Sequence, residues 1–359
     1  MTEPTPLTRY GATRADIDAL VAEWGEPKYR AQQTWDALLS SRPLDDATPL
    51  PRALRDRLAD ALPLSLDVAT VQTAADEMTT KWLWSSVTDG AQVETVLMRS
   101  PNRATVCVSS QAGCAMGCTF CATGQAGFER HLTAAEIVEQ VVRAQHVSPD
   151  RVGNVVFMGM GEPLANYDNT WAAVERLHDD FGISARRITV STVGVVPGIK
   201  RLAAERLPVT LAVSLHAPDD ALRNTLVPLN HRYPIADVLD AAADFAGAHG
   251  RRITFEYACI AGVNDRPDQA NALGDLLRSF PGAGGAHVNL IPLNPTAGFA
   301  SGAAPTPPRL RLFADRLAER GITATIRRNR GTDIDAACGQ LRSRVVMPDP
   351  TAASTRMSP

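Results

Sequence analysis

From residue 105 onward, the chain alternates short apolar runs with amphipathic helical patterns, and this alternation constrains the fold more than any other feature. The runs at 105–109, 154–158, 187–191, 209–215, 253–258 and 287–293 predict six strands, each followed by a helix. A last strand is expected near 323–327. Strands joined by helices pair in parallel. The sequence therefore predicts an α/β fold, in which a parallel, curved sheet closes partway into a (β/α)6 barrel.

Proline-rich joints and turn signals divide the rest of the chain. Residues 1–75 are predicted to form a small helical domain, whose mixed basic and acidic residues fit a packing cap and an RNA-contacting module equally well. Residues 76–100 are predicted to form a β-hairpin linker, because Thr88-Asp89-Gly90 is a turn signal between two strand patterns. The main domain is expected over 101–346. Residues 347–359 are rich in Pro, Ser and Thr and are predicted to be disordered.

Three cysteines follow the first strand of the alternation at C-x3-C-x2-C spacing, namely Cys114, Cys118 and Cys121. Three thiolates on one short loop can face a single bound group, and a four-iron cluster held by three of them keeps one iron open. A structural zinc site needs a fourth ligand, for which Cys107 on the preceding strand is the nearest candidate. The spacing, with Phe120 directly before the last cysteine, favours the cluster and resembles the signature of the radical SAM superfamily.

Polar and glycine-rich segments come directly after several of the other predicted strands. Gly161 and Glu162 follow the second strand, where glycine lets the backbone approach a ligand and the carboxylate can accept hydrogen bonds from an amine. Polar segments at 191–192, at 214–216 and at 294 follow the third, fourth and sixth strands. Each segment alone is typical of a turn or a cap. Gathered at the carboxyl ends of parallel strands, beside the cysteine loop, they favour a cofactor site.

The composition limits the possible partners. Lys and Arg number 36 against 39 Asp and Glu, so the formal net charge is −3, and contacts with nucleic acid must come from local patches. No apolar segment follows the first residues, and no run of about 18 apolar residues occurs. We therefore expect a cytoplasmic protein that spans no membrane and whose six cysteines do not form a disulfide scaffold. A monomer is the default expectation.

Much of the chain, from about residue 10 to residue 345, resembles the RlmN/Cfr family of radical SAM RNA methyltransferases. The resemblance is carried by the cysteine loop and by residues 103–111, 158–163, 214–218, 289–295 and 331–341. It implies methylation of C2 of an adenine in 23S rRNA and, in some bacteria, in tRNA. It also implies a [4Fe-4S] cluster and S-adenosyl-L-methionine (SAM) as cofactors, with a flavodoxin- or ferredoxin-type reductant.

The resemblance also implies roles for individual residues. Cys114, Cys118 and Cys121 would bind the cluster. The SAM pocket would be lined by Gly161, Glu162, Ser191, Ser214, Leu215, His216 and Asn294. Cys338 would carry the methyl group, Cys107 would be its partner thiol, and Glu94 would be a candidate proton acceptor. Cys259 matches no such role and is expected to be structural.

The implied chemistry explains why two cysteines are needed outside the loop. An adenine C2–H is neither nucleophilic nor acidic, so direct methyl transfer has no lone pair to use. Cys338 would first take a methyl group from one SAM, a step that requires its thiolate. A radical from a second SAM would turn this methyl group into a methylene radical that adds to C2. Cys107 would then attack the sulfur of Cys338, forming a disulfide and releasing the product.

Glu94 can be interpreted in two ways. It lies among apolar neighbours in a strand pattern, and on the pattern alone a solvent-facing side chain is expected. If it instead faces the target base, as the resemblance implies, burial should raise its pKa and make it a general base.

RNA contacts are expected from local groups of arginines. The best candidate is the run from Arg327 to Arg330, just before the Cys338 loop, because it can reach phosphates next to the reactive cysteine. Weaker candidates are Arg186-Arg187, Arg309 with Arg311, and Arg251-Arg252, the last being typical of a solvated strand end.

Three other functions fit parts of the same sequence. An enzyme of the same family that methylates C8 of the adenine would share the cluster, both cysteines and the mechanism. A radical SAM enzyme acting on a small molecule or a protein would share the loop, but would not need the Cys107 and Cys338 pair. A non-catalytic zinc- or iron-binding, RNA-associated protein would need only the cysteine loop.

Overall fold

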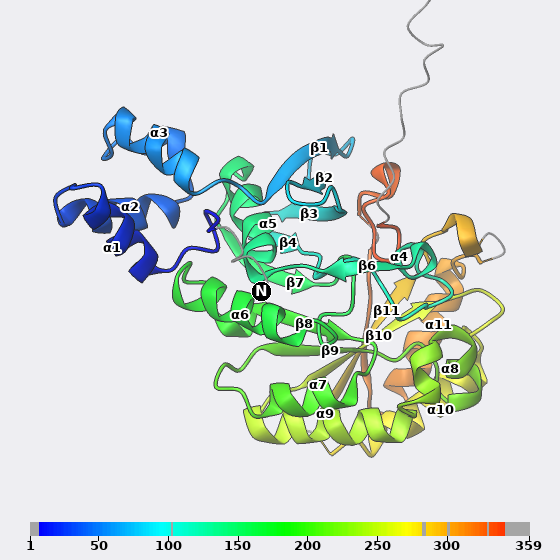
Figure 1. Ribbon diagram of the computed structural model, residues 1–359. Helices are drawn as coiled ribbons and strands as arrows, with labels where there is room; N and C mark the ends of the chain where they lie inside the picture. The colour runs from blue at the N-terminus through cyan, green and yellow to red at the C-terminus, as the bar shows by residue number, and fades with distance from the viewer. Residues whose placement is uncertain (1–6, 102, 282–284, 300–301, 329, 342–359) are drawn as a thin grey trace, which may run out of the picture.

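The computed structural model describes residues 7–101, 103–281, 285–299, 302–328 and 330–341 (Figure 1). The predicted tail at 347–359 lies outside these ranges, as do residues 342–346 of the predicted main domain. The described strands form a ten-stranded sheet in the order β1-β2-β3-β4-β7-β8-β9-β10-β11-β12, and a separate two-stranded sheet of β5 and β6.

Seven neighbouring strands of the larger sheet are parallel, which confirms the predicted α/β fold. They are β4 (Arg103–Cys107), β7 (Val152–Phe157), β8 (Ile188–Thr192), β9 (Thr210–Ser214), β10 (Ile253–Cys259), β11 (Ala286–Pro292) and β12 (Thr323–Ile326). The connecting segments include α5 (Ala134–Val147), α6 (Tyr167–Asp179), α7 (Val196–Ala203), α9 (Ile235–His249), α10 (Pro267–Arg278) and α11 (Pro307–Ala318). Figure 1 shows these helices along one side of the sheet.

Each parallel strand turns one face toward the helices and the other face inward, and β10 illustrates the division. Tyr257 lies on the helix side, where its ring centroid is 5.3 Å from that of Phe313 in α11. Because side chains alternate along a strand, Glu256 lies on the opposite, inner face. Beside it in register are Ser214 of β9 and Asn289 of β11. The inner face of the sheet is therefore polar at the level of Glu256.

Three antiparallel strands extend the sheet beyond β4, namely β1 (Leu66–Thr73), β2 (Thr79–Ser86) and β3 (Gln92–Ser100). The predicted hairpin is confirmed as β2 and β3, whose connection contains Gly90 at φ 74°. β1 corrects the expectation that residues 1–75 are helical throughout. Of its eight residues only Leu66 is buried, so this edge strand has no apolar face that a pattern could reveal.

The N-terminal segment forms three α-helices with an apolar core of their own. They are α1 (Arg14–Glu23), α2 (Tyr29–Leu38) and α3 (Arg52–Ala61), with a short 3-10 helix, η1 (Leu44–Asp46), before the third. Ile17, Val21 and Leu58 are almost fully buried in this core. Its status as a separate, RNA-contacting domain stays a prediction. Within the described ranges, no helix is both long and apolar enough to cross a membrane.

Candidate active site

The cysteine loop is held between two short strands that the sequence did not reveal. β5 (Gln111–Gly113) pairs with β6 (Phe128–His131), and α4 (Ala122–Ala126) follows the last cysteine. The backbone N–H of Cys114 donates to the carbonyl of Gly127 over 2.7 Å. A side chain at Gly113, whose φ is +73°, would lie 2.1 Å from that same carbonyl oxygen, so only glycine allows this approach.

The three loop thiols lie close enough together to influence one another. Burial raises the pKa of Cys114 to about 12 and raises that of the buried Cys118 as well, and the thiol of Cys121 adds to both effects. Thiols in such surroundings become thiolates when a cation is bound to them. In the described part of the chain, no three His, Cys, Asp or Glu side chains converge on one point where a single ion would fit. A [4Fe-4S] cluster instead takes each thiolate on a different iron, so this donor set is compatible with one.

Cys107 and Cys338 come together although they are far apart in the sequence. Cys107 is the last residue of β4 and is buried, whereas Cys338 is solvent-exposed in the loop that follows η5 (Thr332–Ile334). The pKa of Cys107 is raised by burial and further raised by the thiol of Cys338. All six cysteines are free thiols, so the predicted disulfide is not formed in this structure. Among the described residues, Cys107 does not join the loop cysteines in a group of side chains that would hold one zinc ion.

Backbone and amide contacts hold the loop that carries Cys338. Asn294 Nδ2, at the end of β11, donates to the carbonyl of Cys338 over 2.9 Å. The backbone N–H of Ala122, the first residue of α4, donates to the carbonyl of Gly339 over 2.8 Å. The Cys338 loop is thus attached both to the strand ends and to the cysteine loop. Asn294, which the resemblance assigned to the SAM pocket, binds this loop directly.

Glu94 is buried, with 4% of its surface exposed, so the solvent-facing orientation expected from the pattern is wrong. Its carboxylate pairs with Lys81 Nζ on β2 at 3.2 Å, and the same ammonium donates to the carbonyl of Asp335 over 3.3 Å. The next residue, Thr95, accepts a hydrogen bond from Trp84 and donates one to Gln140 of α5, and so lies on the helix side. Glu94 therefore lies on the inner face of the sheet.

Cys107 shares this inner face with Glu94. It stands opposite Val96 in the β3–β4 register, two residues along β3 from Glu94. The two residues that the sequence assigned to late steps of the reaction therefore lie on one side of one sheet. A salt bridge between neighbouring strands allows a carboxylate to be buried there, which explains why the pattern of β3 alone was misleading.

The glycine–glutamate segment after β7 is tightly packed. Gly161 has φ +100°, and a Cβ there would lie 2.5 Å from Gln111 Cβ. Glu162 is 2% exposed; its Oε1 accepts from the backbone N–H of Leu164 (3.0 Å) and its Oε2 from that of Val193 (2.9 Å). Burial raises the pKa of Glu162 to about 7, although these hydrogen bonds oppose the shift. A cationic amine placed against Glu162 would favour its ionised form.

The remaining pocket candidates fall into two groups. Ser191 and Ser214 are half-buried on their strands, and Ser214 stands beside Glu256 on the inner face. Leu215 and His216 are buried, so their side chains support the strand end. His216 Nδ1 accepts from the backbone N–H of Ala258 over 3.0 Å, and burial lowers its pKa to about 3, which keeps the imidazole neutral.

Glu256 and Arg327 complete the surroundings of Cys338, and the sequence did not single out Glu256. The carboxylate of Glu256 is 6% exposed and accepts a hydrogen bond from Asn289 Nδ2 over 2.8 Å. Although Cys338 as a residue is exposed, its thiol lies among protein atoms; this desolvation and the charge of Glu256 raise its pKa, and the charge of Arg327 lowers it. A single glutamate within the apolar strand 253–259 was the signal that could have identified this group.

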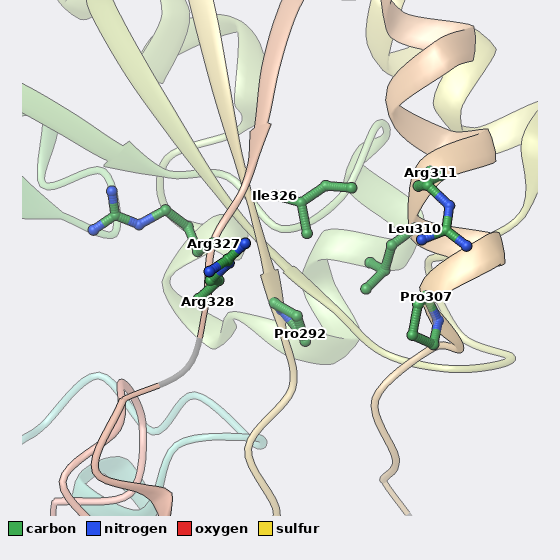
Figure 2. Close-up of a pocket in the computed structure, with 7 residues that line it drawn as sticks. All are labelled: Pro292, Pro307, Leu310, Arg311, Ile326, Arg327 and Arg328. Atoms are coloured by element: carbon green, nitrogen blue, oxygen red, sulfur yellow. The ribbon is translucent and has the colours of Figure 1, made fainter. Parts of the chain in front are cut away.

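A cavity of about 360 Å³ lies beside the end of β12, at the start of the predicted arginine run (Figure 2). Its lining is Pro292, Pro307, Leu310, Arg311, Ile326, Arg327 and Arg328. Figure 2 shows the side chain of Arg327 pointing away from the cavity, so an apolar floor with the guanidinium groups of Arg311 and Arg328 remains, which suits an aromatic or anionic ligand. Asn329, in the middle of the predicted run, lies outside the described residues.

Comparisons with known proteins give a consistent result. The Radical SAM superfamily profile matches residues 108–270. The chain is 52% identical to the "Probable dual-specificity RNA methyltransferase RlmN" of Parafrankia sp., covering 92% of this chain and 90% of that protein. It is 50% identical to the protein of the same name from Chloroflexus aurantiacus, covering 94% and 93%. A crystal structure of a radical SAM methyltransferase from Sphaerobacter thermophilus superposes with a TM-score of 0.86 at 48% identity, covering 94% of this chain and 99% of that one.

Proposed function

The chain belongs to the RlmN family of radical SAM methyltransferases, and on that basis we propose that it methylates C2 of an adenine in 23S rRNA and in some tRNAs. The observation that supports this most is the meeting of Cys107 and Cys338 beside the cysteine loop. A radical SAM enzyme without a methyl-carrying cysteine has no use for a second thiol at that position. The RNA substrates imply action in the cytoplasm, and the site uses residues of a single chain.

The cofactor site would use residues from five strand ends, those of β4, β7, β8, β9 and β11. Cys114, Cys118 and Cys121 would hold a [4Fe-4S] cluster, which, when bound and reduced by a flavodoxin- or ferredoxin-type protein, supplies the electron that cleaves SAM to a 5′-deoxyadenosyl radical. Glu162 would accept hydrogen bonds from the amino group of SAM. The other pocket residues would be Gly161, Ser191, Ser214, Leu215, His216 and Asn294.

Cys338 would perform the first methyl transfer. Its thiolate attacks the methyl carbon of SAM, a sulfur–carbon bond forms as the old one breaks, and S-adenosylhomocysteine leaves. The thiol proton must first be removed, and Glu256 is the buried carboxylate whose charge acts on Cys338. Arg327 stabilises the thiolate in the meantime.

Cys107 and Glu94 would complete the second half of the reaction. Loss of a hydrogen atom turns the methyl group on Cys338 into a methylene radical, which adds to C2, and Glu94 takes the C2 proton. The thiolate of Cys107 then attacks the sulfur of Cys338. A disulfide would form as the carbon–sulfur bond breaks, the surplus electron would pass to the cluster, left oxidised by the cleavage of SAM, and the freed carbon would take up a proton to become the methyl group of the product.

RNA would reach this site as an unpaired nucleotide, because C2 of an adenine inside a helix is covered by base pairing and stacking and cannot meet Cys338 and Glu94 together. The cavity in Figure 2 suits a flanking nucleotide, with Arg311 and Arg328 placed for a phosphate and the apolar floor for a base. Its position next to Arg327, which acts on Cys338, favours a role close to the target adenine.

Mass spectrometry of nucleosides from 23S rRNA, treated with the reduced enzyme and SAM carrying a CD3 methyl group, tests this function. We expect C2-methyladenosine with two deuterium atoms, since one is removed before the methylene group is transferred. The same label on C8-methyladenosine would identify the C8 enzyme of the family. An intact CD3 group would refute the methylene route. A colourless protein containing zinc after anaerobic reconstitution would refute the enzyme altogether.

A further inference from the structure

A fully buried arginine lies behind the cysteine loop. Arg223, in α8 (Asp220–Leu226), is 0% exposed. Its Nε donates to Leu215 O (3.0 Å), its Nη1 to Asn230 Oδ1 (2.7 Å), and its Nη2 to Val193 O (2.6 Å) and Ser214 O (3.1 Å). All four acceptors are neutral. A buried charge is costly unless an opposite charge compensates it, so we expect a negatively charged group near Arg223.

Among the described residues, no carboxylate forms a salt bridge with Arg223, although Asp220 acts on it from a greater distance. Burial lowers the pKa of Arg223 to about 10, so it stays protonated at neutral pH, and Cys118 and Asp220 oppose the shift. The Asp220 carboxylate is oriented toward other donors, since its Oδ1 accepts from Asn230 Nδ2 and from the backbone N–H of Ile235, each over 2.9 Å, and its charge compensates that of Arg223 only in part. His216, which also faces the arginine, stays neutral.

The cysteine loop lies directly against the helix that carries Arg223. The backbone N–H of Thr119 donates to the carbonyl of Leu226 over 3.1 Å, and Cys118 packs with Leu226 and Val227 in one apolar cluster. Cys118 is 6% exposed and Arg223 is 0% exposed, so little water separates the loop from the charge of Arg223. The helix therefore brings a fixed positive charge to the buried side of this loop.

We propose that Arg223 is a positioning residue whose charge stabilises the anionic, thiolate-bound cluster and thereby raises its reduction potential. The inference rests on the proposed function, which supplies the cluster. Three thiolates give an oxidised [4Fe-4S] cluster one net negative charge, and reduction adds a second. A nearby cation in a water-excluded site favours the more negative form. The hydrogen bonds of Arg223 also hold the ends of β8 and β9, where Ser191 and Ser214 lie.

The test is the midpoint potential of the reconstituted cluster, measured by titration with dithionite and followed by electron paramagnetic resonance. We compare wild type, Arg223→Gln, Arg223→Lys and the control Arg278→Gln, which removes an exposed charge of α10. Arg223→Gln should shift the potential to a more negative value. Arg223→Lys keeps the charge and should stay near wild type, as should the control. A glutamine variant that binds the cluster with the wild-type potential would overturn the proposal.

The glutamine variant can also fail to fold, because it leaves buried carbonyls without donors. In that case the lysine variant tests whether the charge at residue 223 sets the potential. A folded Arg223→Lys protein with a near-native potential supports the charge role, whereas loss of the cluster in the lysine variant as well means that only the hydrogen-bond geometry matters and the proposal is wrong. Failure of the wild-type protein to take up any cluster would instead refute the proposed function.

Discussion

Replacing Glu162 with glutamine should change how the stability of the protein depends on pH. The carboxyl group has a pKa of about 7 in the folded protein against an ordinary value of 4.5, because it is almost fully buried. Each unit of pKa corresponds to about 1.4 kcal/mol, so ionising this group in the folded state costs roughly 3 kcal/mol more than in the unfolded chain.

Whether stability rises or falls with pH depends on whether the folded or the unfolded protein holds the Glu162 proton. Between about pH 4.5 and pH 7 the folded protein keeps the Glu162 proton and the unfolded chain has lost it. The stabilisation from this group is therefore fully present below about pH 4.5 and is lost as the pH rises through about 7. Glutamine cannot ionise, but its amide replaces one of the two oxygens that accept from Leu164 and Val193, at a cost of about 1–3 kcal/mol.

Urea unfolding of both proteins at pH 5, 6, 7 and 8 measures the difference. We expect Glu162→Gln to be less stable than wild type by about 1–3 kcal/mol at pH 5, and to reach or exceed wild type at pH 8. Subtracting the unfolding free energy of the variant from that of wild type at each pH removes the contributions of the other titrating groups. His146, whose pKa is lowered to about 4 by burial, is one of these groups. Curves that run parallel from pH 5 to pH 8 would refute the reasoning. In the same range, wild-type affinity for SAM should rise with pH, because an ammonium group favours the ionised carboxylate.

Three further substitutions test the reaction. Cys338→Ala should keep cluster and SAM binding but lose methylation, with Cys259→Ala, a buried thiol of β10, as the active control; methylation above background by the first variant would remove the methyl-carrier role. Cys107→Ala should trap enzyme covalently bound to RNA on denaturing gels, and a normal yield of free product would contradict this. Lys81→Met should destabilise the fold by about 3–5 kcal/mol, because it leaves Glu94 buried without its cation, and adding Glu94→Gln should recover part of the loss in urea unfolding. A double variant no more stable than the single one would show that the ion pair is not the cause.

The sequence predicted well those elements in which apolar residues recur at a regular spacing. The parallel strands depend on local pattern and appear where expected. β1, β5 and β6 were missed because an exposed edge strand and strands of three and four residues have no buried alternation to detect. Glu94 was misjudged because the charge that allows its burial, Lys81, is on a neighbouring strand, and a pattern along one strand contains no information about the next.

The features of the candidate site likewise fall into those that a local pattern reveals and those that it does not. The C-x3-C-x2-C spacing is local and could be recognised directly, whereas the proximity of Cys107 and Cys338 followed only from the family resemblance. The sequence gives no indication that Arg223 is buried, because an arginine in a short helix is typical of a solvated surface. Its burial depends on backbone carbonyls of two strands, which a sequence does not represent.

The Cys338 loop explains why residues from so many parts of the chain must cooperate. Lys81 binds it from the hairpin, Asn294 from the end of β11, and Ala122 from the cysteine loop. In the proposed reaction, the Cys338 thiol meets a SAM molecule, a target base and Cys107 in turn, and no single one of these contacts would fix it for all three. Because the contacts come from separate elements, each can hold a different part of the loop, and Cys338 itself remains exposed for its successive partners. This arrangement accounts for a reactive cysteine on a loop rather than on a strand.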